Sequence, residues 1–526
     1  MSPTSHEIEL KLEAPAHALA RLTQSSLLRS AANGSSKTST LVSVYFDTDG
    51  LKLRKKGLSL RVRRVGGRHV QTVKQEGGEG GPFFTRKEWE HDIGGAQPDL
   101  TVLRETELEP LLNRKLRRDL KPLFETRVRR SVFPIRDGGS EIELAIDEGV
   151  VEAGAQSSPL CEVELELKRG EPSKLFELAR KIAKRVPARL AVKSKAERGY
   201  ELIGSEEPKA VRAAPIALTP TSSRHEAFQS IVRECLRQLT ANEPAMRAGD
   251  PEGLHQMRVG LRRLRVAISL FADILRDPQT EEIVAKLKWI SGELGPAREL
   301  DIFIDSVAMP AMHEQRNQSG LVALFKDLKR SREDAFCHAC AAIESGRFHG
   351  LVVDVVGWIE AGDWTRSTDD VIRTLRKQPI AGFAEDEMRR CWAQVLKRGR
   401  KLAQLGRKRR HKLRIQAKKL RYASEFFAGA FPCKKATKRR KTFVARLEKL
   451  QDALGDLNDI AVHEVLTERI VDEQNVSGKP RGDSARMAFA AGRLAGREEA
   501  RAASVVKGAV YAHSTFAKTK PFWRQR

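Results

Sequence analysis

The 526-residue sequence contains few cysteines and few aromatic residues, and both shortages narrow the class of protein. Six cysteines spread over this length do not form the dense framework of a disulfide-stabilised secreted domain. Cys337 and Cys340 have redox-motif spacing, but they lie in an alanine-rich, helix-like stretch, and we interpret them as packing residues. Aromatic residues make up 6% of the chain, and few lie among its basic runs, so base-stacking platforms for nucleic acid are not indicated.

Long hydrophobic runs are also missing. No stretch reaches the roughly 18 apolar residues that a membrane-spanning helix needs. The N-terminus lacks the basic region and apolar core of a signal peptide. The sequence therefore predicts no membrane association and favours a cytoplasmic protein.

Positive charge is abundant, with a formal net charge of +26. Residues 1–205 carry +7 of it and the remainder carries +19. Such an excess suggests a polyanionic partner: nucleic acid, an anionic membrane or polyphosphate. The basic runs at 407–412 and 434–441 are more typical of solvated helix faces than of specific sites, so a nucleic-acid partner is not favoured.

The chain is too long for one ordinary core, and its patterns change once along its length. Short alternating runs separated by glycine-rich turns predict an α+β domain over residues 1–203. A polar, proline- and alanine-rich stretch at 204–222 reads as a linker. Helical periodicity then continues over 223–526 and predicts an all-α domain.

The helical half repeats itself. "LHQMRVGLRRLR" at 254–265 matches "RHKLRIQAKKLR" at 410–421, and "LGPAREL" at 294–300 matches "LGDLNDI" at 454–460. Two matched blocks in the same order predict duplicated helical bundles, at about 223–380 and 381–526.

Charged residues alternate with apolar ones along the strands of the first half. In "SHEIELKLE", Glu7, Glu9 and Lys11 share one face. A single strand of this kind is usually half-buried with its charged face in water. Here acidic and basic faces recur on several strands, so a closed antiparallel barrel that points them inward is the alternative. Arginines and lysines would hold phosphate, and carboxylates would supply hard oxygen ligands for Mg²⁺ or Mn²⁺.

The ordered set of charged motifs resembles the CYTH domain, the family of triphosphate tunnel metalloenzymes. The resemblance covers about residues 1–203 and is carried by the ExExK run Glu7-Ile-Glu9-Leu-Lys11, "LSLRVRR" with Arg61 and Arg63, "TVK" with Lys74, the RxExE run Arg86-Lys-Glu88-Trp-Glu90, "FETRVRR" with Arg127 and Arg129, "ELAIDEG" with Asp147, "EVELELK" with Glu162 and Glu164, and "KSKAERGYEL" with Lys193.

The resemblance implies an eight-stranded antiparallel tunnel that binds a linear triphosphate and one or two Mg²⁺ or Mn²⁺ ions. It implies that five carboxylates hold metal: Glu7, Glu9, Asp147, Glu162 and Glu164. It implies that eight basic residues hold phosphate: Lys11, Arg61, Arg63, Lys74, Arg86, Arg127, Arg129 and Lys193. The catalytic set that it implies is Glu7, Glu9, Lys11, Arg61, Arg63 and Arg127. For Arg129 and Glu166, a role as an outer partner of the site remains open.

Basic residues also line one face of each repeated helix. The first row is His255, Arg258, Arg262 and Arg265, and the second is His411, Arg414, Lys418 and Arg421. Like charges on one face repel, so the rows call for a polyanion or for acidic partners such as Glu299 and Asp459. The two histidines are interpreted as phosphate contacts, with a structural role as the alternative.

These rows, with "ARELD" and "LQDALGDLND", resemble the CHAD domain over about residues 220–526. That resemblance implies two antiparallel four-helix bundles, a basic groove that binds inorganic polyphosphate, and association with polyphosphate granules.

Together the two halves predict a metal-dependent hydrolase that removes the terminal phosphate of inorganic triphosphate or short polyphosphate. Two alternatives stay open. One is a polyphosphate-binding scaffold with weak catalysis, and the other is a nucleotide enzyme, either an organic triphosphatase or an adenylate cyclase.

Overall fold

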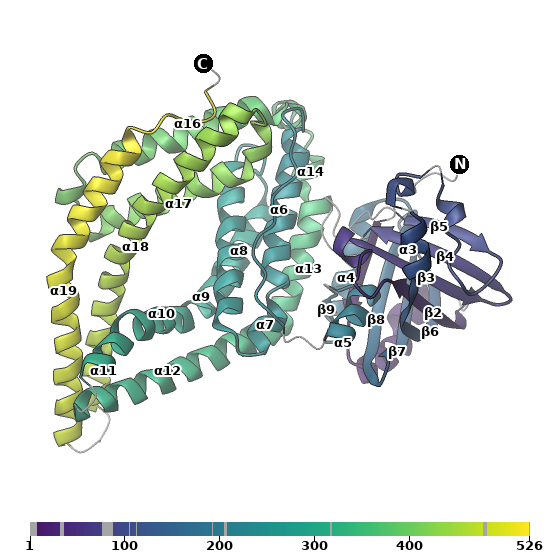
Figure 1. The fold of residues 1–526 in the computed structure, drawn as a ribbon, viewed down its shortest axis with the longest axis horizontal. Coiled ribbons are helices and arrows are strands. Elements are labelled where there is room, and N and C mark those ends of the chain that lie inside the picture. The colour runs from purple at the N-terminus through teal and green to yellow at the C-terminus, as the bar shows by residue number, and fades with distance from the viewer. Residues whose placement is uncertain are drawn as a thin grey trace. The chain divides into compact units, whose positions relative to one another are not determined.

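The protein divides into two compact units (Figure 1). One contains residues 1–209 and 344–366, and the other contains residues 210–343 and 367–526. The computed structural model describes residues 8–31, 36–75, 88–104, 106–111, 113–191, 193–204, 208–315, 318–476 and 481–524. Within these ranges no helix combines the length and the apolar character needed to cross a membrane.

An antiparallel sheet forms the centre of the first unit. Its strands in the described ranges are β1 Ile8–Glu13, β2 Lys37–Asp47, β3 Leu58–Val65, β4 Arg68–Gln75, β5 Glu88–Ile93, β6 Lys121–Asp137, β7 Ser140–Ala153, β8 Gln156–Arg169 and β9 Arg189–Leu190. They follow the order β5-β4-β3-β2-β6-β7-β8-β1-β9. The predicted fold class is confirmed, with nine strands instead of eight. The additional strand, β9, has two residues, which is too short to show an alternating pattern.

The apolar face of this sheet packs outward beneath helices, as the alternation of charged and apolar residues along the strands predicted. Leu10 and Leu12 of β1 are fully buried and lie beside α4, Pro172–Ala183. On β3, Leu60 and Val62 join one apolar cluster with Leu116 of α3, Arg114–Asp119. The other α-helices within residues 1–209 are α1 Ala16–Thr23, α2 Ser26–Ala31 and α5 Lys195–Gly204. The charged side chains that alternate with these leucines and valines consequently face the other side of the sheet.

Two helices of the first unit come from far along the chain. α13, Gly346–Ala361, lies in the part that the sequence assigned to the helical domain, and α14, Asp363–Arg366, follows it. Asp354 of α13 accepts a hydrogen bond from Arg180 of α4 at 2.6 Å. α13 is apolar on nearly every side, which is typical of a buried helix. The compact units therefore differ from the predicted domain boundaries by this segment.

The second unit is entirely helical in the described ranges. Its helices are α6 Arg224–Thr240, α7 Glu243–Arg247, α8 Pro251–Leu270, α9 Pro278–Glu293, α10 Gly295–Phe303, α11 Met309–Glu314, α12 Ser319–Glu344, α15 Asp370–Lys377, α16 Ile380–Gly399, α17 Arg407–Phe426, α18 Lys434–Val476 and α19 Arg481–Ala517. α18 and α19 run side by side as a long hairpin (Figure 1).

The internal repeat is visible in helix lengths. The first basic row lies on α8 and the second on α17, and both helices contain 20 residues. The block that follows differs between the copies. "LGPAREL" spans a break between α9 and α10, whereas "LGDLNDI" lies inside the continuous α18. Pro296 explains the break, because proline is tolerated in the first turn of a helix but not in its interior.

Candidate functional site

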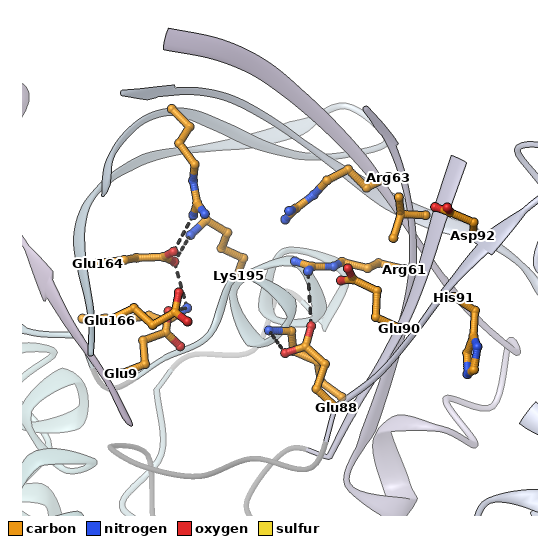
Figure 2. A pocket seen from close by; sticks show the side chains of 14 residues that line it. Glu9, Arg61, Arg63, Glu88, Glu90, His91, Asp92, Glu164, Glu166 and Lys195 are labelled. Carbon is orange, nitrogen blue, oxygen red and sulfur yellow. Dashed lines mark hydrogen bonds and ion pairs between the residues drawn. The ribbon is translucent and has the colours of Figure 1, made fainter. Parts of the chain in front are cut away.

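A charged cavity of about 570 Å³ lies on the inner side of the sheet. Cross-strand pairing decides which side chains share this face, because directly paired residues of an antiparallel ladder point to the same side. The pairs Lys11–Glu164 and Arg130–Asp147 are two examples. Side chains from β1, β3, β4, β5, β6 and β8 line the one cavity, so the sheet curves around it (Figure 2).

Basic residues form one wall. Arg61 and Arg63 of β3 point into the space opposite Glu164 and Lys195 (Figure 2). Burial lowers the pKa of Arg63 to about 10, and the neighbouring Arg61 adds to this effect. Its Nε donates to the hydroxyl of Ser43 at 3.0 Å, which is a neutral partner, and the carboxylate of Glu164 offsets its positive charge only in part. A phosphate oxygen would supply the missing negative charge.

Glu88 of β5 ties this wall together. Its carboxylate lies 2.6 Å from Nζ of Lys74 and 3.6 Å from Arg61. Burial would raise the pKa of Glu88, but Lys74 and Arg61 outweigh it and lower that pKa. Burial also lowers the pKa of Lys74, with Arg61 adding to it. Glu88 and Glu90 of β5 therefore offset part of the positive charge that Arg61, Arg63 and Lys74 bring to this wall.

Carboxylates cluster on the opposite side. Asp147 of β7 and Glu162 and Glu164 of β8 are all buried, and one oxygen from each lies within 4.8 Å of the others. In the part of the chain that the structure describes, these three carboxylates form the group that lies close enough together to bind one metal ion. Hard oxygen donors of this kind suit Mg²⁺ or Mn²⁺.

Cations compensate the cluster. Nζ of Lys195 lies 2.9 Å from Asp147, 2.8 Å from Glu162 and 2.7 Å from Glu164. Lys11 contacts Glu164 at 2.8 Å, and Arg130 pairs with both Asp147 and Glu164. Burial would raise the pKa of Glu164, but Lys11, Lys195 and Arg130 hold that pKa well below its usual range. Burial would likewise lower the pKa of Lys195, and the three carboxylates hold it well above the usual lysine range.

Most of the predicted tunnel residues meet at this site. Those that line the cavity are Glu9, Lys11, Arg61, Arg63, Lys74 and Glu164. Asp147 and Glu162 complete the carboxylate cluster beside it. Glu7 and Arg86 lie outside the described residues. Glu166, which the sequence indicates as a possible outer partner of the site, also lines the cavity.

Three predicted phosphate contacts lie elsewhere. The side chains of Arg127 and Arg129 are 62% and 64% exposed and pair with Glu125 and Glu148. They share a face, as predicted, but the prediction that this face lines the tunnel is wrong. Register decides this, because Arg130 pairs across to Asp147 while Arg129 pairs across to Glu148. Lys193 forms an ion pair with Glu201 at 2.7 Å and is not among the residues that line the cavity.

The sequence reasoning missed Arg130 and Lys195. Arg130 follows Arg129 in "RVRRS", and two adjacent arginines cannot be told apart without the strand pairing. Lys195 lies in "KSKAERGY" at the beginning of α5, two residues beyond Lys193, which the sequence predicts as a phosphate contact. The chain there leaves a strand and enters a helix, so neither periodicity assigns the side chain a direction.

A second basic site lies in the helical unit, where the rows on α8 and α17 approach each other. Burial lowers the pKa of Lys418 on α17 to about 6, with further lowering by Arg262 of α8 and by Arg414 and Arg421 of its own helix. Burial also lowers the pKa of Arg258 to about 10, and Arg262 adds to it. Such crowding of positive charge favours an anionic ligand.

The other predicted members of the rows have mixed surroundings. His411 is hydrogen-bonded to Asn458 at 2.9 Å, and Arg414 lies 4.0 Å from Asp459, the predicted acidic partner. Burial lowers the pKa of His255, and the nearby Arg298 adds to it. Arg265 is exposed.

Two family models match successive parts of the chain. Residues 5–200 match the family model described as the CYTH domain, and residues 230–468 match that of the CHAD domain. Inorganic triphosphatase from Haemophilus influenzae is 28% identical over 178 residues, which is 32% of this chain and 47% of that protein. The match thus spans about half the length of this curated relative.

Two solved structures are also similar. The CHAD domain from the plant Ricinus communis is 28% identical, with 58% of this chain and 96% of that chain covered and a TM-score of 0.49. A protein from Hippeastrum, described as having a dominant triphosphatase activity, is 20% identical, with 38% of this chain and 96% of that chain covered and a TM-score of 0.29.

Proposed function

The chain carries a CYTH domain followed by a CHAD domain, and from this premise we propose that it hydrolyses the terminal phosphate of inorganic triphosphate or short polyphosphate with a divalent metal ion. The observation that carries the proposal is the single cavity in which a basic wall faces buried carboxylates. A metal-bound oligophosphate would satisfy both sets of charges at once, with the metal ion at the carboxylates and the phosphate oxygens at the arginines and lysines. The name of the Haemophilus influenzae relative agrees with this chemistry.

The carboxylate cluster fits a divalent ion. Asp147, Glu162 and Glu164 offer hard oxygens close together, and Glu9 lines the same cavity. These residues would hold Mg²⁺ or Mn²⁺, which would neutralise phosphate charge and favour attack at phosphorus. Both ions suit this set of oxygen donors.

The remaining residues act by position. Arg61, Arg63 and Lys74 would bind the phosphate oxygens and stabilise the charge that develops as the terminal anhydride bond breaks. Glu88 holds Lys74 and Arg61 in place through the contacts at 2.6 and 3.6 Å. Water adds to the terminal phosphorus, the bridging P–O bond breaks, and the products are orthophosphate and the shortened chain.

The helical unit has a separate proposed role, binding of inorganic polyphosphate along the rows on α8 and α17. The crowding of Arg262, Arg414 and Lys418 supports it. A tethered binding site would raise the substrate concentration near the cavity. If the cavity proved inactive, this site alone would make the protein a polyphosphate-binding scaffold.

One assay tests the enzyme proposal. Phosphate release is measured from tripolyphosphate, ATP, thiamine triphosphate and long-chain polyphosphate, with Mg²⁺, with Mn²⁺ and with excess chelator. We expect metal-dependent release that is fastest with tripolyphosphate. Faster turnover of ATP or thiamine triphosphate would indicate the organic triphosphatase alternative, and cyclic AMP formed from ATP would indicate a cyclase. Absence of turnover with every substrate, in protein of native circular dichroism, would rule out the enzyme.

A further inference from the structure

Lys195 occupies the centre of the carboxylate cluster. Its ammonium lies between 2.7 and 2.9 Å from an oxygen of Asp147, Glu162 and Glu164. The ammonium donates hydrogen bonds to Glu162 and Glu164 and forms an ion pair with Asp147. Arg130 contacts two members of the cluster, and Lys11 and Arg198 contact one each, so among the described cations Lys195 is the one that contacts all three.

A metal ion bound by these three carboxylates would occupy the space between them that the ammonium fills. Mg²⁺ binds carboxylate oxygens at about 2.0–2.1 Å, which is shorter than any of these nitrogen–oxygen distances. An ammonium centred on the three oxygens and a metal ion bound to them therefore exclude each other.

We propose that Lys195 is the resident counter-cation of this site, and that a divalent ion binds only by displacing its ammonium into the cavity. The inference rests on the metal dependence in the proposed function and goes beyond it, because it assigns a competitor to the metal and a destination to the competitor.

The local structure permits the movement. Lys195 begins α5, and the backbone at that point is fixed by its neighbours. The N–H of Ser194 donates to the Glu197 carboxylate at 2.7 Å, and the N–H of Glu197 donates to the Ser194 hydroxyl at 3.1 Å. The lysine side chain can consequently rotate about its own flexible stem without unwinding the helix.

The destination is also part of the structure. Lys195 lines the cavity that Arg61, Arg63 and Lys74 line from the other side. A displaced ammonium would face the space proposed for the phosphate chain. Metal binding would then add a positive group to the phosphate site, and by thermodynamic linkage phosphate would favour metal binding.

Two measurements on the full-length protein test the inference. The first is the Mn²⁺ dissociation constant, obtained from the electron paramagnetic resonance signal of free Mn²⁺. Removal of the competing charge in Lys195→Met should tighten Mn²⁺ binding by about tenfold or more. Lys193→Met is the matched control, since it makes the same chemical change two residues away at an ion pair with Glu201. It should bind Mn²⁺ as the wild type does.

The second measurement uses only wild-type protein, so it stands even if Lys195→Met does not fold. Lysines are acylated with acetic anhydride, with and without saturating Mg²⁺, and quantified by mass spectrometry. Displacement predicts several-fold more labelling of Lys195 with Mg²⁺, and no change at Lys193.

The outcomes separate the two proposals. Mn²⁺ binding by the wild type with equal or weaker binding by Lys195→Met would overturn the inference and leave the proposed function standing. Tighter binding without increased labelling would also overturn it, because the lysine would then act through its charge without moving. Failure of both proteins to bind Mn²⁺ would overturn the metal dependence as well.

Discussion

Arg130 on β6 holds Asp147 on β7 through two parallel hydrogen bonds, from Nε to Oδ1 at 2.7 Å and from Nη2 to Oδ2 at 2.6 Å. Asp147 is fully buried. The preceding residue, Arg129, reaches Glu148 on the exposed side of the same two strands. One step along the strand thus separates a buried, bidentate ion pair from a solvent-exposed one.

This difference predicts losses of stability of very different size for two alanine substitutions. Arg130→Ala removes the guanidinium that pairs with both Asp147 and Glu164. It should lower the free energy of unfolding by about 3 kcal/mol, the lower end of the range for a broken buried ion pair, because Lys195 stays beside both carboxylates. Arg129→Ala should lower it by about 0–1 kcal/mol, as for exposed pairs. Urea denaturation measures both. Equal losses in the two variants would contradict the assignment of their faces.

Glu9 should be needed for turnover. It lines the cavity and lies 3.1 Å from Lys11. Glu9→Gln removes the charge while keeping the shape, and we expect Mn²⁺ affinity to fall by about tenfold or more, with phosphate release falling in parallel. Glu148→Gln is the control, since Glu148 lies on the other face with Arg129. Wild-type rates and affinity in Glu9→Gln would remove Glu9 from the proposed metal ligands.

The side chain of Lys418 should lower the free energy of unfolding and raise the affinity for polyphosphate. Burial lowers its pKa to about 6 from an ordinary value of 10.5, with Arg262, Arg414 and Arg421 adding to the shift. Between these two pH values the unfolded chain carries a proton that the folded chain lacks. The contribution of Lys418 to the free energy of unfolding therefore falls as the pH decreases from 10.5 toward about 6.

The test is Lys418→Met beside Lys412→Met, an exposed lysine on the same helix. At pH 7, Lys418→Met should raise the melting temperature and lower polyphosphate affinity, whereas Lys412→Met should change neither by much. Wild-type affinity should rise as the pH falls through about 6, because Lys418 then becomes charged without a bound anion. A flat pH profile that matches that of Lys418→Met would place the groove elsewhere.

Gly357 should tolerate no larger side chain. A Cβ added there would lie 3.1 Å from Cβ of Phe176 on α4, whereas a Cβ at Gly350 of the same helix meets nothing within 4 Å. Gly357→Val should lower the free energy of unfolding by about 1–3 kcal/mol through overpacking. Gly350→Val makes the same change of helix propensity without the clash. Similar stability of the two variants would show that α13 does not pack closely on α4.

Much of the first unit followed from alternation along its strands. The pattern of "SHEIELKLE" placed Glu9 and Lys11 on one face and Leu10 and Leu12 on the other, and the structure buries the leucines beneath helices. The order of acidic and basic strands then predicted a shared cavity, which the described residues form. The pattern worked here because a strand has a period of two and each strand carried its own signal.

Alternation alone could not decide which face of β6 points inward. Arg127, Arg129 and Arg130 stand in one short run, and only pairing with β7 selects Arg130. Lys195 escaped for a related reason, since it begins a helix directly after irregular chain. The contact between α4 and α13 could not be predicted either, because the two helices lie more than 150 residues apart in sequence. The residues of an apolar helix do not indicate which surface the helix covers.

The sequence by itself thus determined the classes of the two halves, which residues of a strand share a face, and the chemistry of the charges, because these depend on local periodicity and residue type. Tertiary structure alone decided the register that brings Arg130 to Asp147 and the placement of Lys195 among three carboxylates. Both depend on contacts between segments whose separation along the chain leaves no local pattern.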